Sequence, residues 1–170
     1  LAHPRAVEIR EWNYASHIPD FRDAFIAAVA RGRVIGGHLE GLRGGPLQAA
    51  VALGCRNDHE TGSAEEALEK VRAGIVVQIR HGTGARDLRE VTRAITELGA
   101  DPRGFALTAD QQELWSLAEY GHLDDKLRSV VAEGVGPIDA VCMATINPAR
   151  SLGIADRYGA VVPGHFASLC

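Results

Sequence analysis

Short apolar runs alternate with longer amphipathic segments along this chain. The clearest run is Ile75–Ile79, which is continuous and rich in β-branched residues, as strands buried on both faces of a sheet are. Shorter runs of the same kind are Ala6–Ile9, Val34–Ile35, the segment that leads into Asn57, and Phe105–Leu107. The pattern therefore predicts five short strands.

Between consecutive strands, apolar residues recur at helical spacing and predict one helix in each connection. Ser63 and Glu66 form a capping-box pattern at the start of the helix that runs to Gly74. The other predicted helical segments are Pro19–Arg31, Pro46–Leu53, Asp87–Leu98, Asp124–Ala132, Pro137–Ile146 and Pro148–Leu152. Single-helix connections imply parallel strands with right-handed crossovers. Five such units fit either a doubly wound sheet or most of an eight-unit barrel.

The composition is that of a globular protein, with 170 residues, 46% hydrophobic and 24% charged residues, and a formal net charge of −4. Scattered Lys and Arg residues exclude the basic stripe of nucleic-acid-binding proteins. No apolar run approaches the roughly 18–20 residues of a membrane-spanning helix. The three cysteines show no CxxC spacing, so we expect a reducing cytoplasm and no disulfide framework. Because the chain begins with Leu1, we expect it to be part of a longer protein.

Polar residues gather directly after the predicted strands: Glu11 after the first, His38 after the second, His59 and Glu60 after the third, and Asp110 after the fifth. The carboxyl ends of parallel strands are where α/β folds place their active sites. Two imidazoles with two or three carboxylates suit a divalent metal of borderline softness. Such a metal lowers the pKa of its water from about 15.7 to about 7. An ordinary hydrogen-bonded role is the alternative for each histidine.

Longer motifs carry a resemblance to a known family. They are Val34–His38, Asp58-His59-Glu60 followed by Ser63–Lys70, Gly121–Asp125, Met143–Arg150 and Gly159–Gly164. Together they resemble the adenine deaminase family of the amidohydrolase superfamily, over essentially the whole chain. The last two motifs are common to many amidohydrolases. The Asp-His-Glu triplet with the downstream Gly121–Asp125 motif points more narrowly to adenine deaminase.

The resemblance implies an α/β fold, a (β/α)8 TIM-type barrel with a small β domain built from both chain ends. Residues 1–158 would be about the last five βα units of the barrel, and residues 159–170 the start of the small C-terminal β domain. It also implies one or two divalent metal ions (manganese, iron or zinc), a purine as small-molecule substrate, and a homo-oligomer. The implied reaction converts adenine or a related 6-aminopurine to hypoxanthine and ammonia by attack of metal-bound hydroxide.

The resemblance also assigns roles to individual residues. The implied metal ligands are Glu11, His38, His59 and Asp110. Asp110 would in addition take a proton from the attacking water. Glu60 would contact the purine ring and carry protons to it, so that two carboxylates from different strand ends share the acid–base work.

Four further features have a candidate functional role and also a purely structural explanation. Trp12 is a predicted substrate contact, although a large aromatic side chain also serves as a core anchor. Arg80 is a predicted substrate contact, and the Gly-rich segment Arg80–Arg86 that it opens is either a ligand cradle or a tight βα turn. His122, beside a helix start, is expected to cap that helix or to support the metal ligands without binding the metal.

Two departures from the family pattern keep other interpretations open. The family has a His-x-His metal pair on its first strand, and this chain does not contain it. The family usually has two adjacent aspartates after its eighth strand, where this chain reads Thr108-Ala109-Asp110-Gln111. A slip of one residue would put Ala109 in the place of the catalytic base. The alternatives are an amidohydrolase that acts on a cyclic amide or a different amine, and a non-catalytic incomplete barrel.

Overall fold

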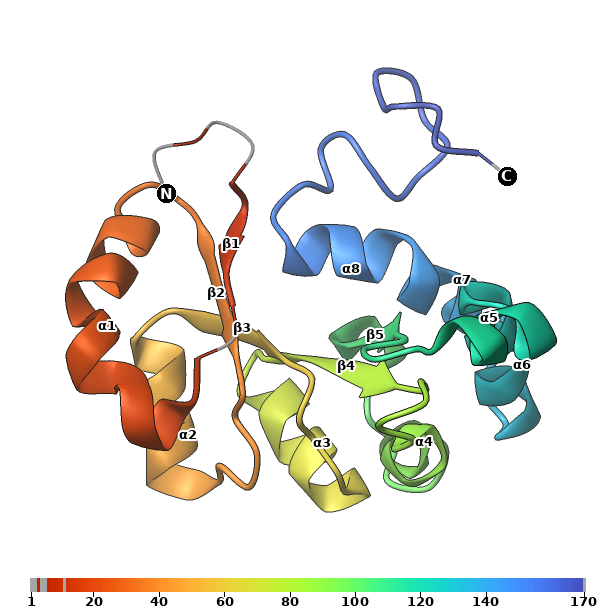
Figure 1. Ribbon diagram of the computed structural model, residues 1–170, viewed down its shortest axis with the longest axis horizontal. Coiled ribbons are helices and arrows are strands. Elements are labelled where there is room, and N and C mark those ends of the chain that lie inside the picture. The colour runs from red at the N-terminus through yellow and green to blue at the C-terminus, as the bar shows by residue number, and fades with distance from the viewer. Residues whose placement is uncertain (1–2, 4–5, 11, 170) are drawn as a thin grey trace.

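The computed structural model describes residue 3, residues 6–10 and residues 12–169. Its centre is a sheet of parallel strands in the order β1-β2-β3-β4-β5 (Figure 1). The strands are Glu8–Ile9, Val34–Gly37, Cys55–Asp58, Val76–Arg80 and Phe105–Thr108. The strands lie side by side in the same order as in the chain, as they do in a barrel. In a doubly wound sheet the strand order reverses part-way across the sheet. The predicted α/β fold with a partial barrel is therefore confirmed.

Helices connect the strands and continue beyond the last one. In Figure 1, α1 to α4 lie along one side of the sheet, and α5 to α7 gather beyond β5. Their bounds are α1 Tyr14–Val29, α2 Gly44–Ala52, α3 Ala64–Arg72, α4 Leu88–Thr96, α5 Leu114–Tyr120, α6 Leu123–Ala132, α7 Pro137–Ala144 and α8 Ile146–Ser151, with a 3₁₀ turn at Pro102–Gly104.

Two helices differ from the sequence prediction. Helix α1 begins at Tyr14, so Pro19, which was predicted as the first helical residue, falls inside it. Helix α5 was not predicted, because its sequence lacks the repeating apolar positions of a helix with one buried face. In the structure its large apolar side chains point outward, and Leu114 is 82% exposed. In contrast, the predicted capping box at the start of α3 is supported by a hydrogen bond from the backbone N–H of Glu66 to the Ser63 hydroxyl.

The core consists of two apolar clusters on the helix-covered side of the sheet. One surrounds β2 and includes Trp12, Phe25, Ile35, Leu47 and Cys55. The other joins β4 and β5 to α4, α6 and α7, and includes Val77, Ile79, Val91, Phe105, Val130 and Met143. The carboxyl ends of the strands lie at one edge because the strands are parallel. The two clusters hold the strands in place by packing them against the helices.

Beyond α8, the described residues 152–169 form turns and irregular backbone (Figure 1). No strand forms in this described segment, so the start of a small C-terminal β domain at residues 159–170 stays a prediction. Across the described ranges, none of the helices combines the length and apolar character needed to cross a membrane.

Candidate functional site

The predicted site residues lie at the edge formed by the carboxyl ends of the strands. In chain order they are His38 after β2, His59 and Glu60 after β3, Arg80 at the end of β4, and Asp110 in the loop after β5. Because the strands are parallel, these positions meet on the same side of the molecule. Glu11 lies outside the described residues, so its assignment as a metal ligand stays a prediction.

Three of these side chains form a compact group. In the part of the chain that the structure describes, His38, His59 and Glu60 each offer a ligand atom within 4.8 Å of the others. The two imidazole rings meet edge to face, with centroids 4.8 Å apart, and Nε2 of His59 lies 3.5 Å from Oε1 of Glu60. Two imidazole nitrogens and a carboxylate are donors that manganese, iron and zinc accept, so these residues fit a divalent metal.

The position of His38 depends on the contact between Gly37 and Trp12. A Cβ atom at Gly37 would lie 2.7 Å from the Trp12 ring, so this step of β2 requires glycine. The His38 backbone N–H donates to the Trp12 carbonyl at 3.0 Å. Trp12 itself is 1% exposed and packs against Phe25, with ring centroids 4.6 Å apart. Its prediction as a substrate contact is corrected, because the ring is buried in the core.

Arg80 bridges the carboxylates of the site. Its Nη1 lies 2.7 Å from Oε1 of Glu60, while Nη2 and Nε lie 2.7 and 2.8 Å from Oδ2 of Asp87. Burial on its own would lower the pKa of Arg80, but the Asp87 and Glu60 carboxylates outweigh it and raise that pKa above its ordinary value. The guanidinium is therefore a fixed cation that orients Glu60 and is itself anchored by Asp87.

Asp110 takes a different position from the one predicted for a metal ligand. Its backbone is left-handed, with φ 55°, and its N–H donates to the Thr108 hydroxyl at 3.2 Å. The carboxylate points to Arg80, with Oδ2 3.6 Å from Nη1. Within the described residues it stands outside the group of His38, His59 and Glu60. The structure thus brings Glu60 to the two histidines in place of Asp110.

A pocket of about 360 Å³ opens beside this group, and its lining includes Arg10, His59, Gln78, Thr108, Asp110 and His122. This volume lies in the range of small-molecule sites, roughly 300–1,000 Å³. His122 occupies the N-cap position of α6, but its imidazole makes no capping hydrogen bond. Instead its backbone N–H donates to Oδ1 of Asp124 at 2.8 Å. The predicted cap role of the side chain is therefore wrong, whereas its support of the metal ligands stays a prediction, and His122 lines the pocket.

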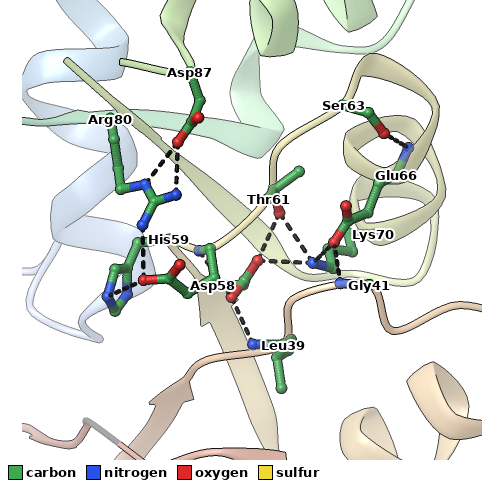
Figure 2. A network of polar contacts seen from close by, with 11 residues as sticks. Leu39, Gly41, Asp58, His59, Thr61, Ser63, Glu66, Lys70, Arg80 and Asp87 are labelled. Atoms are coloured by element: carbon green, nitrogen blue, oxygen red, sulfur yellow. Dashed lines mark hydrogen bonds and ion pairs between the residues drawn. The ribbon is translucent and has the colours of Figure 1, made fainter. Parts of the chain in front are cut away.

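Behind the His59–Glu60 segment lies a buried polar network (Figure 2). Asp58 and Lys70 have fully buried side chains, with Nζ 2.8 Å from Oδ2. The other oxygen, Oδ1, accepts hydrogen bonds from the backbone N–H groups of Leu39 at 2.8 Å and Glu60 at 3.1 Å. The Thr61 hydroxyl donates to Oδ2 at 2.6 Å. Both oxygens of the carboxylate are therefore fully engaged.

The network continues from Lys70 to Glu66 on the same helix. The ammonium donates to the Glu66 carboxylate and, at 3.1 Å, to the Thr61 hydroxyl. Glu66 Oε1 in turn accepts the backbone N–H of Gly41 at 2.9 Å. Burial on its own would raise the pKa of Asp58, but the Lys70 charge and the hydrogen bonds outweigh it and hold that pKa below its ordinary value. Asp58 is thus ionised at neutral pH.

The Gly-rich segment after β4 is a tight turn and not a cradle for a ligand. The backbone N–H groups of His81, Gly82 and Thr83 donate to protein carbonyls at 3.1, 2.9 and 2.7 Å. A Cβ atom at Gly82 would lie 2.1 Å from the Ala109 carbonyl oxygen, which shows how closely this turn packs on the loop after β5. Because these N–H groups already donate to protein carbonyls, they favour the interpretation of this segment as a tight βα turn.

Comparison with known proteins gives a consistent result. A model of the amidohydrolase family matches residues 15–170. The adenine deaminase of Deinococcus deserti is 42% identical over 141 residues, which cover 83% of this chain and 25% of that protein. The adenine deaminase of Desulfatibacillum aliphaticivorans is 35% identical over 173 residues, covering 99% of this chain and 30% of that protein. The chain thus spans less than a third of the length of either relative.

Solved structures share the fold. A crystal structure of an amidohydrolase superposes with a TM-score of 0.61 at 20% identity, over 92% of this chain and 40% of that chain. An amidohydrolase from Thermotoga maritima superposes with a TM-score of 0.52 at 16% identity, over 91% of this chain and 46% of that chain. At such identities the likeness concerns the fold alone, and it agrees with a partial barrel.

Proposed function

Because the chain belongs to the amidohydrolase family, we propose that it takes part in the hydrolytic deamination of adenine or a related 6-aminopurine, which yields hypoxanthine and ammonia. The observation that carries the proposal is the group of His38, His59 and Glu60 at the carboxyl edge of the strands. The substrate class is supported by adenine deaminases that are 35–43% identical to this chain over most of its length.

The proposed metal ligands are the side chains of His38 and His59, with Glu11 kept from the family resemblance, and Glu60 lies beside them as a proton carrier. Two imidazoles with carboxylates match manganese, iron or zinc better than magnesium or calcium, which favour oxygen ligands alone. When bound, a divalent metal would lower the pKa of a water from about 15.7 to about 7 and so supply hydroxide at neutral pH.

The protein's own carboxylates would carry the protons. As the water oxygen bonds to C6, the ring loses aromaticity, and Glu60 would donate a proton to the ring nitrogen next to C6. Asp110 would accept one proton of the attacking water and deliver it to the amine as the C–N bond breaks, and the remaining hydroxyl proton would return to Glu60 as the C6 carbonyl forms. Acid–base catalysis of this kind contributes roughly 10²–10⁴-fold. Both carboxylates face Arg80, from different strand ends.

Arg80 would orient Glu60 before substrate arrives. Its contact with Glu60 is short, and Asp87 holds the other side of the guanidinium. A carboxylate held in this way needs no rearrangement when the purine enters, and such preorganisation is a main source of catalytic rate. In this proposal Arg80 acts on the substrate through Glu60.

The activity can be tested on protein produced from the complete gene and loaded with Mn²⁺, Fe²⁺ or Zn²⁺. We expect ammonia release from adenine, with adenosine and cyclic ureides as the competing substrates. Turnover of a ureide without turnover of adenine would overturn the proposed substrate and favour a different amidohydrolase activity. No turnover of any of these substrates would favour the non-catalytic barrel.

A matched pair of variants tests the role of Glu60. Glu60→Gln keeps the shape of the side chain but cannot carry the proton, so kcat should fall roughly 10²–10⁴-fold. Glu40 is an exposed residue in the loop after β2, and Glu40→Gln removes the same charge without touching the group. The Glu40 variant should retain wild-type kcat, and an equal loss in both variants would contradict the assignment.

A further inference from the structure

We propose that Asp58 and Lys70 are positioning residues. Their buried ion pair, extended by Glu66, holds the loops after β2 and β3 at the spacing that brings the candidate metal ligands together. The inference rests on the proposed function, because that proposal gives His38, His59 and Glu60 their roles. Neither Asp58 nor Lys70 is among the proposed ligands or proton carriers.

The loop after β3 is shaped by Asp58 itself. Asp58 is the last residue of the strand, and its Oδ1 accepts the backbone N–H of Glu60, two residues further on. This is an Asx turn, in which a side chain bends the backbone that follows it. His59 lies between the two bonded residues, so the turn sets the directions of both His59 and Glu60.

The same oxygen atom also holds the loop after β2. Oδ1 of Asp58 accepts the backbone N–H of Leu39 at 2.8 Å, and Leu39 directly follows His38. One atom therefore contacts the residue after each of the two histidines. A shift of this carboxylate would move His38 and His59 relative to each other, and their facing rings are 4.8 Å apart.

Lys70 keeps the carboxylate in that place. Its ammonium bonds to Oδ2 of Asp58, which leaves Oδ1 free for the two backbone donors. It also bonds to Glu66, whose Oε1 accepts the N–H of Gly41 in the loop after β2. The Lys70 ammonium therefore links helix α3 to the loops after β2 and β3 (Figure 2).

Stability alone does not explain this arrangement. The attraction within a fully buried ion pair is largely offset by the loss of hydration, and apolar residues of similar volume often serve the fold equally well. What apolar residues cannot supply is an acceptor for the backbone N–H groups of Leu39 and Glu60. Outer residues that orient metal ligands in this way typically change metal affinity or activity by about 10–100-fold when they are replaced.

Asp58→Asn in the protein from the complete gene tests the inference. The amide of asparagine has one acceptor oxygen and one NH₂ group. Its NH₂ group must therefore point either at the Lys70 ammonium or at the two backbone N–H donors, and it can accept from neither. We expect faster hydrogen exchange of the Leu39 and Glu60 amides, measured without metal. We also expect Mn²⁺ affinity and kcat for adenine to fall about 10–100-fold, with a smaller change in KM.

The triple variant Asp58→Asn/Lys70→Met/Glu66→Gln separates positioning from charge. Without the ammonium, the Asn amide can turn its oxygen to Leu39 and Glu60 and its N–H to Thr61. The Gln amide oxygen still accepts the N–H of Gly41, and no buried charge is left unpaired. Slow exchange of the two amides and most of the Mn²⁺ affinity should therefore return. A triple variant that is worse than Asp58→Asn in both measurements would overturn the inference.

A core variant controls for lost stability. Val130 is fully buried in the apolar cluster that joins β4 and β5 to α4, α6 and α7. Val130→Ala therefore weakens the fold without changing either loop. It should leave Mn²⁺ affinity and the two amides unchanged. If Asp58→Asn behaves like Val130→Ala, the pair only stabilises the fold and the inference is wrong. If wild-type protein does not turn over adenine, the proposed function fails, while exchange and Mn²⁺ binding still decide this inference.

Discussion

Arg80→Lys separates charge from geometry at the candidate site. Lysine keeps the positive charge but replaces the planar guanidinium with a single ammonium. In the structure, Nη1 serves Glu60 while Nη2 and Nε serve Asp87. One ammonium cannot take the places of all three nitrogens. The variant must therefore loosen either Glu60 or the Asp87 anchor that holds the side chain in place.

The size of the effect follows from these contacts. A hydrogen bond between charged groups contributes about 1.5–3 kcal/mol, which is roughly 10- to 150-fold in rate if the contact orients the transition state. The Arg80 side chain is 12% exposed and that of Glu60 is 21% exposed, so water replaces part of the lost contact. We therefore expect kcat/KM for adenine to fall toward the lower end, about 10- to 30-fold.

Steady-state ammonia release measures this loss, and Arg103→Lys is the matched control. Arg103 makes the same two-nitrogen contact with Asp101, through Nε at 2.9 Å and Nη2 at 2.5 Å, but its side chain is 77% exposed. Exposed ion pairs contribute little, so this variant should keep wild-type kcat/KM. If Arg80→Lys also keeps it, the guanidinium does not orient Glu60 for catalysis.

Three further predictions concern buried positions. Because the pKa of Asp58 lies below its ordinary value of about 3.9, its stabilising contribution is present above that pH and lost as the pH falls through the lowered value. Urea unfolding should therefore show the wild type weakening below about pH 4 more steeply than Asp58→Asn. Burial raises the pKa of Cys55 to about 12, so iodoacetamide at about pH 8 should leave this thiol unmodified in native protein; its alkylation, seen by peptide mass spectrometry, would contradict the burial. Gly82→Ala places a Cβ 2.1 Å from a backbone oxygen and should lower the free energy of unfolding by about 1–3 kcal/mol, whereas Gly62→Ala, with nothing within 4 Å, should not.

Local patterns predicted the elements that position the site. The β-branched run Ile75–Ile79 became β4 with a shift of one residue, and the Ser63 cap formed as expected. Strand–helix alternation gave parallel strands, and from these the meeting of His38 with His59 at one edge followed. These features depend on propensity and on the direction of the chain, which a sequence displays directly.

Contacts between elements were not predictable in the same way. Glu66 and Lys70 have the i,i+4 spacing of an exposed ion pair, yet the Lys70 side chain is fully buried against Asp58 from another element. Arg80 was predicted as a substrate contact, and its actual partners are three carboxylates, two of them in loops after other strands. Asp110 was predicted beside the histidines, but its left-handed backbone turns it to Arg80. Each depends on packing that no local pattern records.

The Asp-His-Glu triplet is held from both sides by cations of its own βαβ unit. Lys70 on α3 holds Asp58, and Arg80 at the end of β4 holds Glu60. His59, between them, is left facing His38. Without these anchors the side chains of the loop would sample several rotamers, since fixing a side chain in one conformation costs free energy that its contacts must supply. It follows that the triplet alone is a weaker signature of this geometry than the triplet together with a lysine in the following helix and an arginine at the end of the following strand.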